Sequence, residues 1–304
     1  MTLEGIITAM VTPFDKEGSI CEASTKKLIN HLIDSGVNGL FILGTNGEFF
    51  SLNDEEKVKF AKLVVEEVRG RIPVYAGAGG ISTQGTIDLV NELEKVKVDA
   101  VSIITPYLIS LTDEEIYRHY EQILKHTNCP IILYNIPQNT HINLSENVVN
   151  KLAKFIKVIG IKDSSGNLEN LSTYLKIAEK HEFSVLIGSD SLILEALKRG
   201  ASGAVAATSN LLPRTDIAIY QSFKENKFEL AQQYQDSIND YRAINKIGSV
   251  PAMLKKALNF TGINVGSPRL PVLPISSKYD DELRIILEKY KKIEKFGEEK
   301  NAKA

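Results

Sequence analysis

Cysteine is scarce in this sequence, tryptophan is absent, and neither acidic nor basic residues dominate. The 304 residues include two cysteines, no tryptophan, 36 lysines and arginines, and 38 aspartates and glutamates. Cys21 and Cys129 lie far apart without a Cys-x-x-Cys spacing, so we expect neither a disulfide framework nor a zinc site and interpret both as packing residues. A net charge of -2 provides no basic surface for nucleic acid or for an anionic membrane. We therefore expect a small-molecule partner.

Long apolar runs are also missing. No segment approaches the ~20 apolar residues that a membrane-spanning helix needs, and the N-terminus lacks the pattern of a secretory signal. We expect a cytoplasmic protein without a membrane segment. The hydrophobic content of 43% and the charged content of 24% are typical of a globular chain with a large core. We expect no metal and no cofactor, because metal-ligand spacing is absent among the five histidines, which are His31, His119, His126, His141 and His181.

What the sequence does contain is a repeated alternation of strand and helix patterns. Short apolar runs rich in β-branched residues alternate with longer amphipathic stretches, which indicates a parallel sheet. Each run is apolar enough for burial on both faces, and no G-x-G-x-x-G follows the first run, so we predict an α/β fold of the (β/α)8 TIM barrel type. The eight expected strands cover residues 5–12, 39–44, 73–79, 100–106, 130–137, 158–163, 184–190 and 203–208.

Capping patterns support helices between these strands. Asn53 with Glu56, and Thr112 with Glu115, have the spacing of a capping box, and Ser145 precedes a hydrophobic series. We predict helices over residues 53–69 and 112–126. Beyond the eighth unit, we predict that residues 1–224 form the barrel and that 225–304 form a helical extension packed on it, with a frayed polar end at 297–304. The helical patterns of this extension cover 227–245, 250–260 and 280–295, and a proline-broken loop covers 266–274.

Lys162 is the first candidate for chemistry. Barrel enzymes place their active sites at the carboxyl ends of the strands, and Lys162 closes the apolar run over 158–161. Such a position is costly for an ammonium group, and removal from water favours the neutral amine that attacks a carbonyl to form an imine. On position alone, a structural ion pair of Lys162 with Asp163 or Glu48 has about the same weight.

Two further candidates lie at other strand ends. Alternation along the fifth strand would aim the Tyr134 hydroxyl into the barrel mouth, where it could shuttle a proton; the alternative is an aromatic side chain that plugs the barrel. The Gly44-Thr45-Asn46-Gly47-Glu48 turn could cradle an anion such as a carboxylate with its backbone N–H groups. The alternative for this turn is an ordinary strand-to-helix connection.

Together, the motifs resemble those of the dihydrodipicolinate synthase and N-acetylneuraminate lyase family, in order and over nearly the whole chain. They are T-P-F at 12–14, G-T-N-G-E at 44–48, Y-N-I-P at 134–137 and G-I-K-D-S-S-G at 160–166. The resemblance implies that Lys162 forms an imine with pyruvate, that Tyr134 transfers the proton and that Thr45 relays it. It also implies that Thr45 and Asn46 hold the carboxylate and that the backbone of Val205 lies beside bound pyruvate. Family members are commonly homotetramers built from dimers.

Three departures from the family pattern bear on the second substrate. Pro137 is followed by Gln138 and Asn139, where the synthases usually have an arginine for the aldehyde substrate's carboxylate. Leu108 stands where a second tyrosine usually completes the proton relay. Asp190 is followed by Ser191, whereas sialic acid lyases have an Asp-Glu pair for sugar hydroxyls.

Asn139 and the G-T-N-G-E-F and K-D-S-S-G runs are more similar to the 4-hydroxy-2-oxoglutarate and 2-keto-3-deoxy sugar acid aldolases. We therefore predict a class I aldolase that cleaves such a 2-oxo acid to pyruvate and an aldehyde, with Asn139, Gly188 and Asp190 as further substrate contacts. The alternative is the synthase that condenses pyruvate with aspartate semialdehyde.

Two other function classes remain open. A non-catalytic binding module would bind pyruvate or a sugar acid through residues 44–46, and Leu108 favours that interpretation. A phosphate-binding barrel would use its seventh and eighth loops, where Gly188 and the glycines at 200–203 lie. Arg199 is the one basic residue placed to assist such a site, so we give this class little weight.

Overall fold

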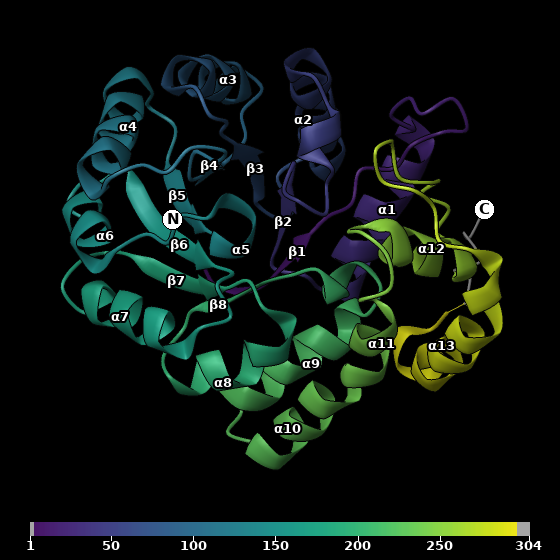
Figure 1. Ribbon diagram of the computed structural model, residues 1–304. Coiled ribbons are helices and arrows are strands. Elements are labelled where there is room, and N and C mark those ends of the chain that lie inside the picture. Colours follow the sequence, from purple (N-terminus) through teal and green to yellow (C-terminus); the bar gives the residue numbers. More distant parts are fainter. Residues whose placement is uncertain (1–2, 297–304) are drawn as a thin grey trace.

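The computed structural model describes residues 3–296, and its strands form a closed barrel. All neighbouring strands in this part of the chain are parallel, and β1 closes the barrel by pairing with both β2 and β8 (Figure 1). The predicted TIM barrel is confirmed, and every expected strand is present. The strands are β1 (Gly5–Ala9), β2 (Gly39–Ile42), β3 (Val74–Ala78), β4 (Ala100–Ile104), β5 (Ile131–Asn135), β6 (Val158–Asp163), β7 (Ser184–Ile187) and β8 (Gly203–Ala206).

All the strands except β6 end earlier than the sequence predicts. The apolar run that begins at Gly5 continues to Val11, yet β1 ends at Ala9. The N–H of Val11 is instead bound by the side chain of Asn210, and the Thr12 hydroxyl donates to the Gly47 carbonyl. The residues past the strand ends are thus buried in the loops of the barrel mouth, so apolar character alone overestimates the strand length.

The barrel interior is packed with side chains from alternate strand positions. This interior cluster consists of Leu3, Ile7, Ala9, Phe41, Tyr75, Ala100, Ile132, Leu186 and Val205. The barrel is therefore a core and not a pore, and a ligand can reach it only from the mouth.

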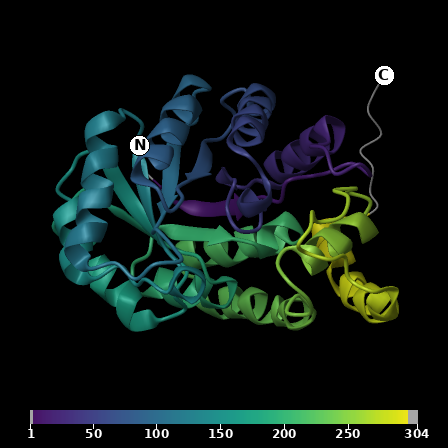
Figure 2. The ribbon, with the colours of Figure 1, turned by 45° about the horizontal axis from the view of Figure 1, so that its top comes forward.

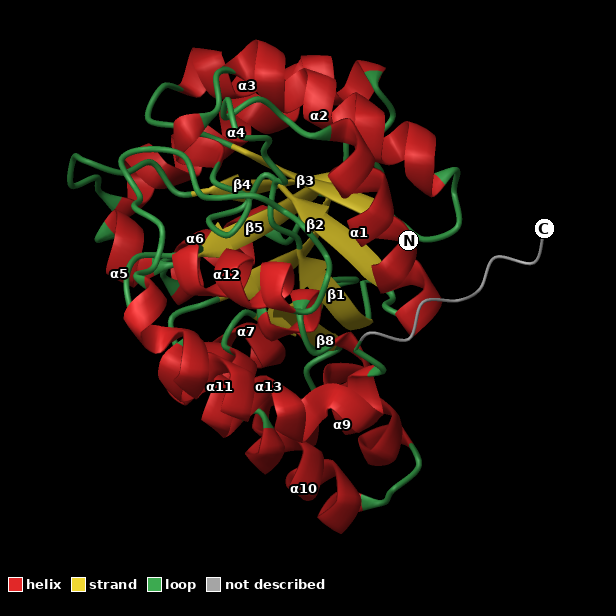
Figure 3. Cartoon of the chain, turned by 90° about the vertical axis from the view of Figure 1, so that its right-hand side faces the viewer, coloured by secondary structure: helices red, strands yellow, loops and turns green. Residues whose placement is uncertain are grey.

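Nine helices lie between or directly after the strands in the described chain, and they surround the barrel (Figure 3). The predicted capping boxes at Asn53 with Glu56 and at Thr112 with Glu115 are both formed, and Ser145 caps α6. The helices are α1 (Glu22–Ser35), α2 (Asp54–Val68), α3 (Thr83–Lys95), α4 (Asp113–His126), α5 (Pro137–Thr140), α6 (Glu146–Leu152), α7 (Leu168–Ala178), α8 (Ile193–Lys198) and α9 (Pro213–Lys224).

Four more helices follow, at the end of the molecule where α1 lies (Figures 1 and 2). They are α10 (Phe228–Ser237), α11 (Asn239–Ile244), α12 (Ala252–Phe260) and α13 (Asp280–Glu294). The residues after α12 contact α1, and α13 packs against α9 and α11. The helical pattern predicted over 227–245 is present but is divided at Ile238 into α10 and α11. The Tyr290 hydroxyl donates to the Ser237 carbonyl and accepts from the Tyr241 N–H, so it replaces one helical hydrogen bond at this break. The boundary at 224/225 stays a prediction, and the predicted fraying of 297–304 lies outside the described residues.

Within residues 3–296, no helix is long and apolar enough to cross a membrane. The same residues contain no group of three or more His, Cys, Asp or Glu side chains that could hold a metal ion.

A buried carboxylate connects the C-terminal helix α13 to the barrel. Glu294 accepts hydrogen bonds from the N–H groups of Arg214 and Thr215, at 3.0 and 2.9 Å, and from the Thr215 hydroxyl at 2.5 Å. These groups belong to the first turn of α9, whose N–H groups have no partner within the helix. Burial raises the pKa of Glu294 from 4.5 to about 7.

This raised pKa predicts a pH-dependent contribution to stability. The folded state favours protonated Glu294, so the stabilisation is complete below pH 4.5 and is lost as the pH rises through about 7. Between about pH 5 and 8, we expect the free energy of unfolding to fall by about 2 kcal/mol more in the wild type than in Glu294→Gln. Chemical denaturation at several pH values measures this difference. If the free energy of unfolding changed with pH in the same way in both proteins, this prediction would be contradicted, since the other buried carboxylates are present in both.

Candidate active site

Lys162 lies at the mouth of the barrel between two aromatic rings. Its side chain is 4% exposed, and β6 places it in register with Tyr134 of β5 and Leu186 of β7. The Nζ atom is 4.2 Å from the ring centroid of Tyr134 and 4.4 Å from that of Phe41. Within residues 3–296, no carboxylate lies within ion-pair distance of Lys162.

The two carboxylates that the sequence offered as ion-pair partners of Lys162 have other partners. Asp163 accepts from the Asn135 side chain and from the backbone and hydroxyl of Ser165, each at 3.0 Å. Glu48 pairs with Lys255 at 2.5 Å. Burial raises the pKa of Asp163, and its three hydrogen bonds oppose that shift. The structural ion pair of Lys162 is therefore absent from this structure.

Gly188 provides the space that the Lys162 side chain occupies. A Cβ atom at this position would lie 1.9 Å from the Ser164 hydroxyl and 3.1 Å from the Cε of Lys162. Only glycine leaves both side chains where they are. The role of Gly188 as a substrate contact stays a prediction. What the structure shows is its packing against Ser164 and Lys162.

Tyr134 lies beside the amine and is 4% exposed. Its ring packs edge to face on Phe41, with ring centroids 6.2 Å apart, and it also contacts Ile104 and Ile136. The described residues offer its hydroxyl no hydrogen-bond partner. Tyr134 therefore packs like an aromatic residue in a core and still presents a free hydroxyl next to Lys162.

The turn formed by residues 44–48 has an unusual backbone and an unsatisfied hydroxyl. Leu43 and Glu48, on either side of the glycines, have positive φ angles of 57° and 54°. A Cβ on Gly77 would lie 2.1 Å from the Leu43 carbonyl oxygen, so β3 can approach this turn only at a glycine. The Thr45 Oγ1 is buried without a hydrogen-bond partner. A bound polar ligand would satisfy this otherwise costly group.

A small hollow extends from this turn to Tyr134. Its lining includes Phe41, Gly44, Gly77, Ser102 and Tyr134. The Ser102 hydroxyl is also buried without a partner, a feature that the apolar pattern of the fourth strand did not reveal. A larger hollow lies outside the barrel between α2 and α3 and contains none of the predicted site residues. We place the candidate site at the smaller hollow, because Ser102 and Tyr134 line it and the Lys162 amine contacts the Tyr134 ring.

The other predicted site residues lie around the mouth in different environments. Val205 of β8 is 2% exposed and belongs to the interior cluster with Phe41. Asp190 accepts the N–H groups of Ala207 and Thr208 at 3.0 and 3.2 Å, and thereby ties the loop after β7 to the loop after β8. Burial raises the pKa of Asp190, an effect opposed first by these two hydrogen bonds and then by attraction to Arg242 and Lys162.

The residues that depart from the family pattern are exposed. Asn139 lies in the short helix α5 with its side chain exposed, and the neighbouring Gln138 donates to the Ser164 carbonyl at 2.7 Å. Leu108 is 83% exposed with a φ of 81°. The imine half of the predicted site is thus assembled around Lys162, while the second-substrate half is open at the surface.

The phosphate-site hypothesis gains no support from Arg199. Its guanidinium pairs with Glu195 one helical turn away on α8, at 2.8 Å. The charge is therefore already compensated by a surface carboxylate.

Comparisons with known proteins extend over nearly the whole chain. The sequence model of the dihydrodipicolinate synthetase family matches residues 2–290. A relative from Desulforudis audaxviator named 4-hydroxy-tetrahydrodipicolinate synthase is 34% identical, with 93% of this chain and 96% of that protein covered. One of the same name from Listeria monocytogenes serotype 4b is 35% identical, with 95% and 99% covered.

Solved structures show the same similarity. The dihydrodipicolinate synthase DapA-2 of Bacillus anthracis superposes with a TM-score of 0.90 at 34% identity, covering 95% of this chain and 99% of that one. YagE of E. coli K12, described as a prophage protein of the dihydrodipicolinic acid synthase family in complex with pyruvate, superposes with a TM-score of 0.90. The identity is 28%, and 96% and 99% of the two chains are covered.

The space at Gly188 yields a test of the amine's position. We expect Gly188→Ala to push the Ser164 hydroxyl aside and to displace the Lys162 side chain by a few tenths of an ångström. Borohydride trapping of pyruvate should therefore slow by up to about 100-fold, which is the effect of a misplacement of about 1 Å. Gly80→Ala is the matched control, because an added Cβ meets nothing within 4 Å there. Trapping is followed by mass spectrometry, and folding by circular dichroism. A folded Gly188→Ala protein that traps pyruvate as fast as the control would refute the packing argument.

Proposed function

The chain belongs to the dihydrodipicolinate synthetase family, whose members are lyases that act through a pyruvate imine, and we propose that Lys162 carries this imine here. One observation carries the assignment: the Lys162 amine is buried between the rings of Phe41 and Tyr134 without a carboxylate partner. A lysine that served only structure would be expected to have such a partner.

The proposed reaction begins when the neutral amine adds to C2 of pyruvate and gives a carbinolamine. Loss of its hydroxyl group as water leaves a protonated imine, which draws electrons from the methyl carbon as that carbon gives up a proton. The resulting enamine adds to the carbonyl carbon of an aldehyde, whose oxygen takes up a proton. Water then releases the product and regenerates the amine. Cleavage of a 2-oxo acid is the same sequence in reverse.

Tyr134 and Thr45 are the proposed proton-transfer residues. The Tyr134 ring contacts the amine, and neither its hydroxyl nor that of Thr45 has a protein partner within the described residues. Both hydroxyls are thus free to bind the carbinolamine or the substrate carboxylate. We propose that Thr45 and Asn46 hold that carboxylate and that the backbone at Val205 lies on the other side of pyruvate.

For the second substrate, we propose first the reaction of the curated relatives, 4-hydroxy-tetrahydrodipicolinate synthesis. The relatives described above carry that name at 34% and 35% identity over more than nine-tenths of the chain. They favour condensation of pyruvate with aspartate semialdehyde over cleavage, which reverses the order of preference that the motifs alone gave.

Retro-aldol cleavage of a 2-keto-3-deoxy sugar acid or of 4-hydroxy-2-oxoglutarate is the second candidate. It is favoured by the uncharged, exposed Asn139 at the position where the resemblance leads us to expect an arginine. Asp190 could contact a sugar hydroxyl only in addition to the two backbone N–H groups that it already binds. This is possible because a carboxylate has about four acceptor sites.

We also propose a cytoplasmic homotetramer built from dimers. Support comes from exposed apolar side chains on the loops that follow β2, β3 and β4, an arrangement typical of a surface covered by another protein. These side chains are Phe50, Ile81, Leu108 and Ile109.

Imine formation is tested by reduction with borohydride in the presence of pyruvate. We expect a pyruvate-derived mass increase on the peptide that contains Lys162, and none in Lys162→Met. Lys154→Met, which changes an exposed lysine just before β6, should label like the wild type. Absence of an adduct in the folded wild type would refute the proposed function.

The second substrate is tested by ranking kcat/KM for pyruvate with aspartate semialdehyde against cleavage of 2-keto-3-deoxy acids, 4-hydroxy-2-oxoglutarate and sialic acid. We expect aspartate semialdehyde to rank first. Asn139→Arg should raise its kcat/KM by about tenfold, because a charged hydrogen bond contributes about 1.5 kcal/mol or more. Asn139→Gln is the uncharged control. A cleavage substrate that ranks first would establish the second candidate instead.

A further inference from the structure

A second buried lysine lies behind the turn of residues 44–48. Lys255 of α12 places its Nζ 2.5 Å from Glu48 Oε1, and the exposed fractions of the two side chains are 1% and 0%. The other oxygen of Glu48, Oε2, accepts the backbone N–H of Arg269 at 2.8 Å. Both oxygens of this fully buried carboxylate are therefore bound by residues from the C-terminal part of the chain.

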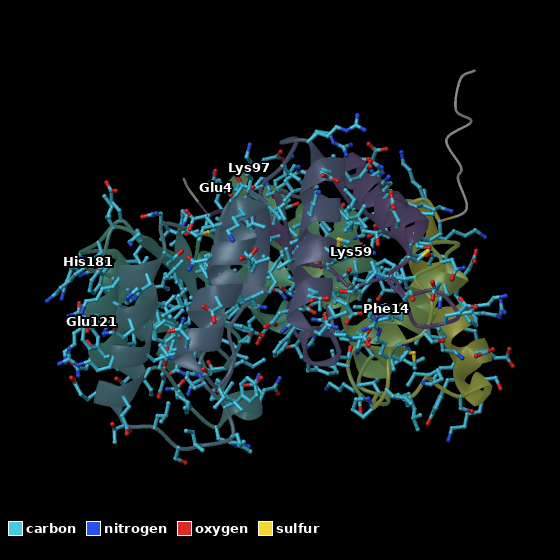
Figure 4. The ribbon with its side chains drawn as sticks, turned by 90° about the horizontal axis from the view of Figure 1, so that it is seen from above. Glu4, Phe14, Lys59, Lys97, Glu121 and His181 are labelled. Carbon is cyan, nitrogen blue, oxygen red and sulfur yellow. The ribbon has the colours of Figure 1, made fainter. Side chains whose placement is uncertain are left out.

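Phe14 and Arg269 complete the enclosure of this ion pair. The Lys255 Nζ lies 4.0 Å from the ring centroid of Phe14, and the Arg269 guanidinium carbon lies 4.4 Å from it. Figure 4 shows Phe14 next to the C-terminal helices. The Arg269 side chain also donates to Glu56 at 2.6 and 3.0 Å, to the Ser51 carbonyl at 3.0 Å and to the Gly18 carbonyl at 2.6 Å.

We propose that Lys255 and Arg269 are positioning residues that hold the 44–48 turn in its substrate-binding conformation through Glu48. The inference rests on the proposed function, in which Thr45 and Asn46 of this turn bind the pyruvate carboxylate. Neither Lys255 nor Arg269 touches the substrate in this proposal. They act through the backbone that presents Thr45 and Asn46.

The backbone connects the ion pair directly to the binding residues. The Glu48 N–H donates to the Thr45 carbonyl at 3.2 Å, and the Thr12 hydroxyl donates to the Gly47 carbonyl at 2.7 Å. Glu48 itself has a φ of 54°, in the left-handed region that costs free energy for a residue with a side chain. If Glu48 loses its counter-charge, its carboxylate must move toward water, and this strained turn has to move with it.

The electrostatic surroundings make this arrangement sensitive to pH. Burial lowers the pKa of Lys255 to about 8, and Glu48 opposes that shift by attraction while Arg269 adds to it by repulsion. Glu56 pairs with Arg269 and does not contact Lys255 directly, and the Phe14 ring beside Lys255 does not titrate. Below about pH 8 the ammonium group is charged and Glu48 is paired, whereas above that pH the pair is lost.

The test is the dependence of imine trapping and turnover on pyruvate concentration in Lys255→Met. We expect the KM for pyruvate to rise about tenfold through weaker binding of the pyruvate carboxylate, and kcat at saturating pyruvate to fall as well, because the same turn carries Thr45, a proposed proton-transfer residue. Lys256→Met is the matched control on the same helix, since Lys256 pairs with Asp280 and not with Glu48. This control should keep the wild-type KM.

A charge-balanced variant separates positioning from folding. Glu48→Gln combined with Lys255→Met removes both charges of the buried ion pair. The double variant should therefore fold even if Lys255→Met alone does not. Its KM for pyruvate should lie closer to that of the wild type than the KM of Lys255→Met does. The KM of the wild type and of Lys256→Met should rise between about pH 7 and 9, and that of the double variant should not.

The outcomes distinguish this inference from the proposed function. A wild type that forms no pyruvate adduct would remove the proposed function itself. A wild type that forms the adduct, together with a folded Lys255→Met whose KM for pyruvate is unchanged, would overturn the positioning role alone. A double variant with a pH-dependent KM like that of the wild type would overturn it as well.

Discussion

The cost of keeping the Lys162 amine out of water is the constraint on which the site depends. The amine lies at the end of an apolar strand, between the rings of Phe41 and Tyr134, and among residues 3–296 no carboxylate lies within ion-pair distance of it. An amine in this position must be accommodated by the packing around it, since no ion pair holds it. The surroundings fit this requirement, because Gly188 leaves space for the side chain and Asp163 is held by Asn135 and Ser165.

The other buried charges at this end of the barrel have partners. Glu48 is paired with Lys255, and Asp190 binds two backbone N–H groups. These bonds fix the loops after β2, β7 and β8 around the mouth. Lys162, to which we assign the chemistry, has no carboxylate within ion-pair distance among residues 3–296, and the ring of Tyr134, whose hydroxyl has no partner there, lies beside it.

Much of the fold and half of the site could be predicted from the sequence, because both depend on local patterns. Strand runs, capping boxes such as Asn53 with Glu56, and a lysine that closes an apolar run are all visible within a few residues. The remainder depends on contacts between distant segments. Nothing near Glu48 in the sequence indicates that Lys255 neutralises it, and nothing near Ser237 indicates that Tyr290 interrupts a helix. The second-substrate residues escaped prediction for a different reason: Leu108 and Asn139 are exposed, and their protein contacts do not define what binds there.

The contact between Glu48 and the last quarter of the chain has a consequence for the order of biosynthesis. The turn of residues 44–48 leaves the ribosome before Lys255 and Arg269, so the Glu48 carboxylate has neither partner until the last quarter of the chain is made. The enclosed ion pair forms only when α12 docks. Completion of the barrel mouth therefore cannot precede synthesis of the C-terminal helices.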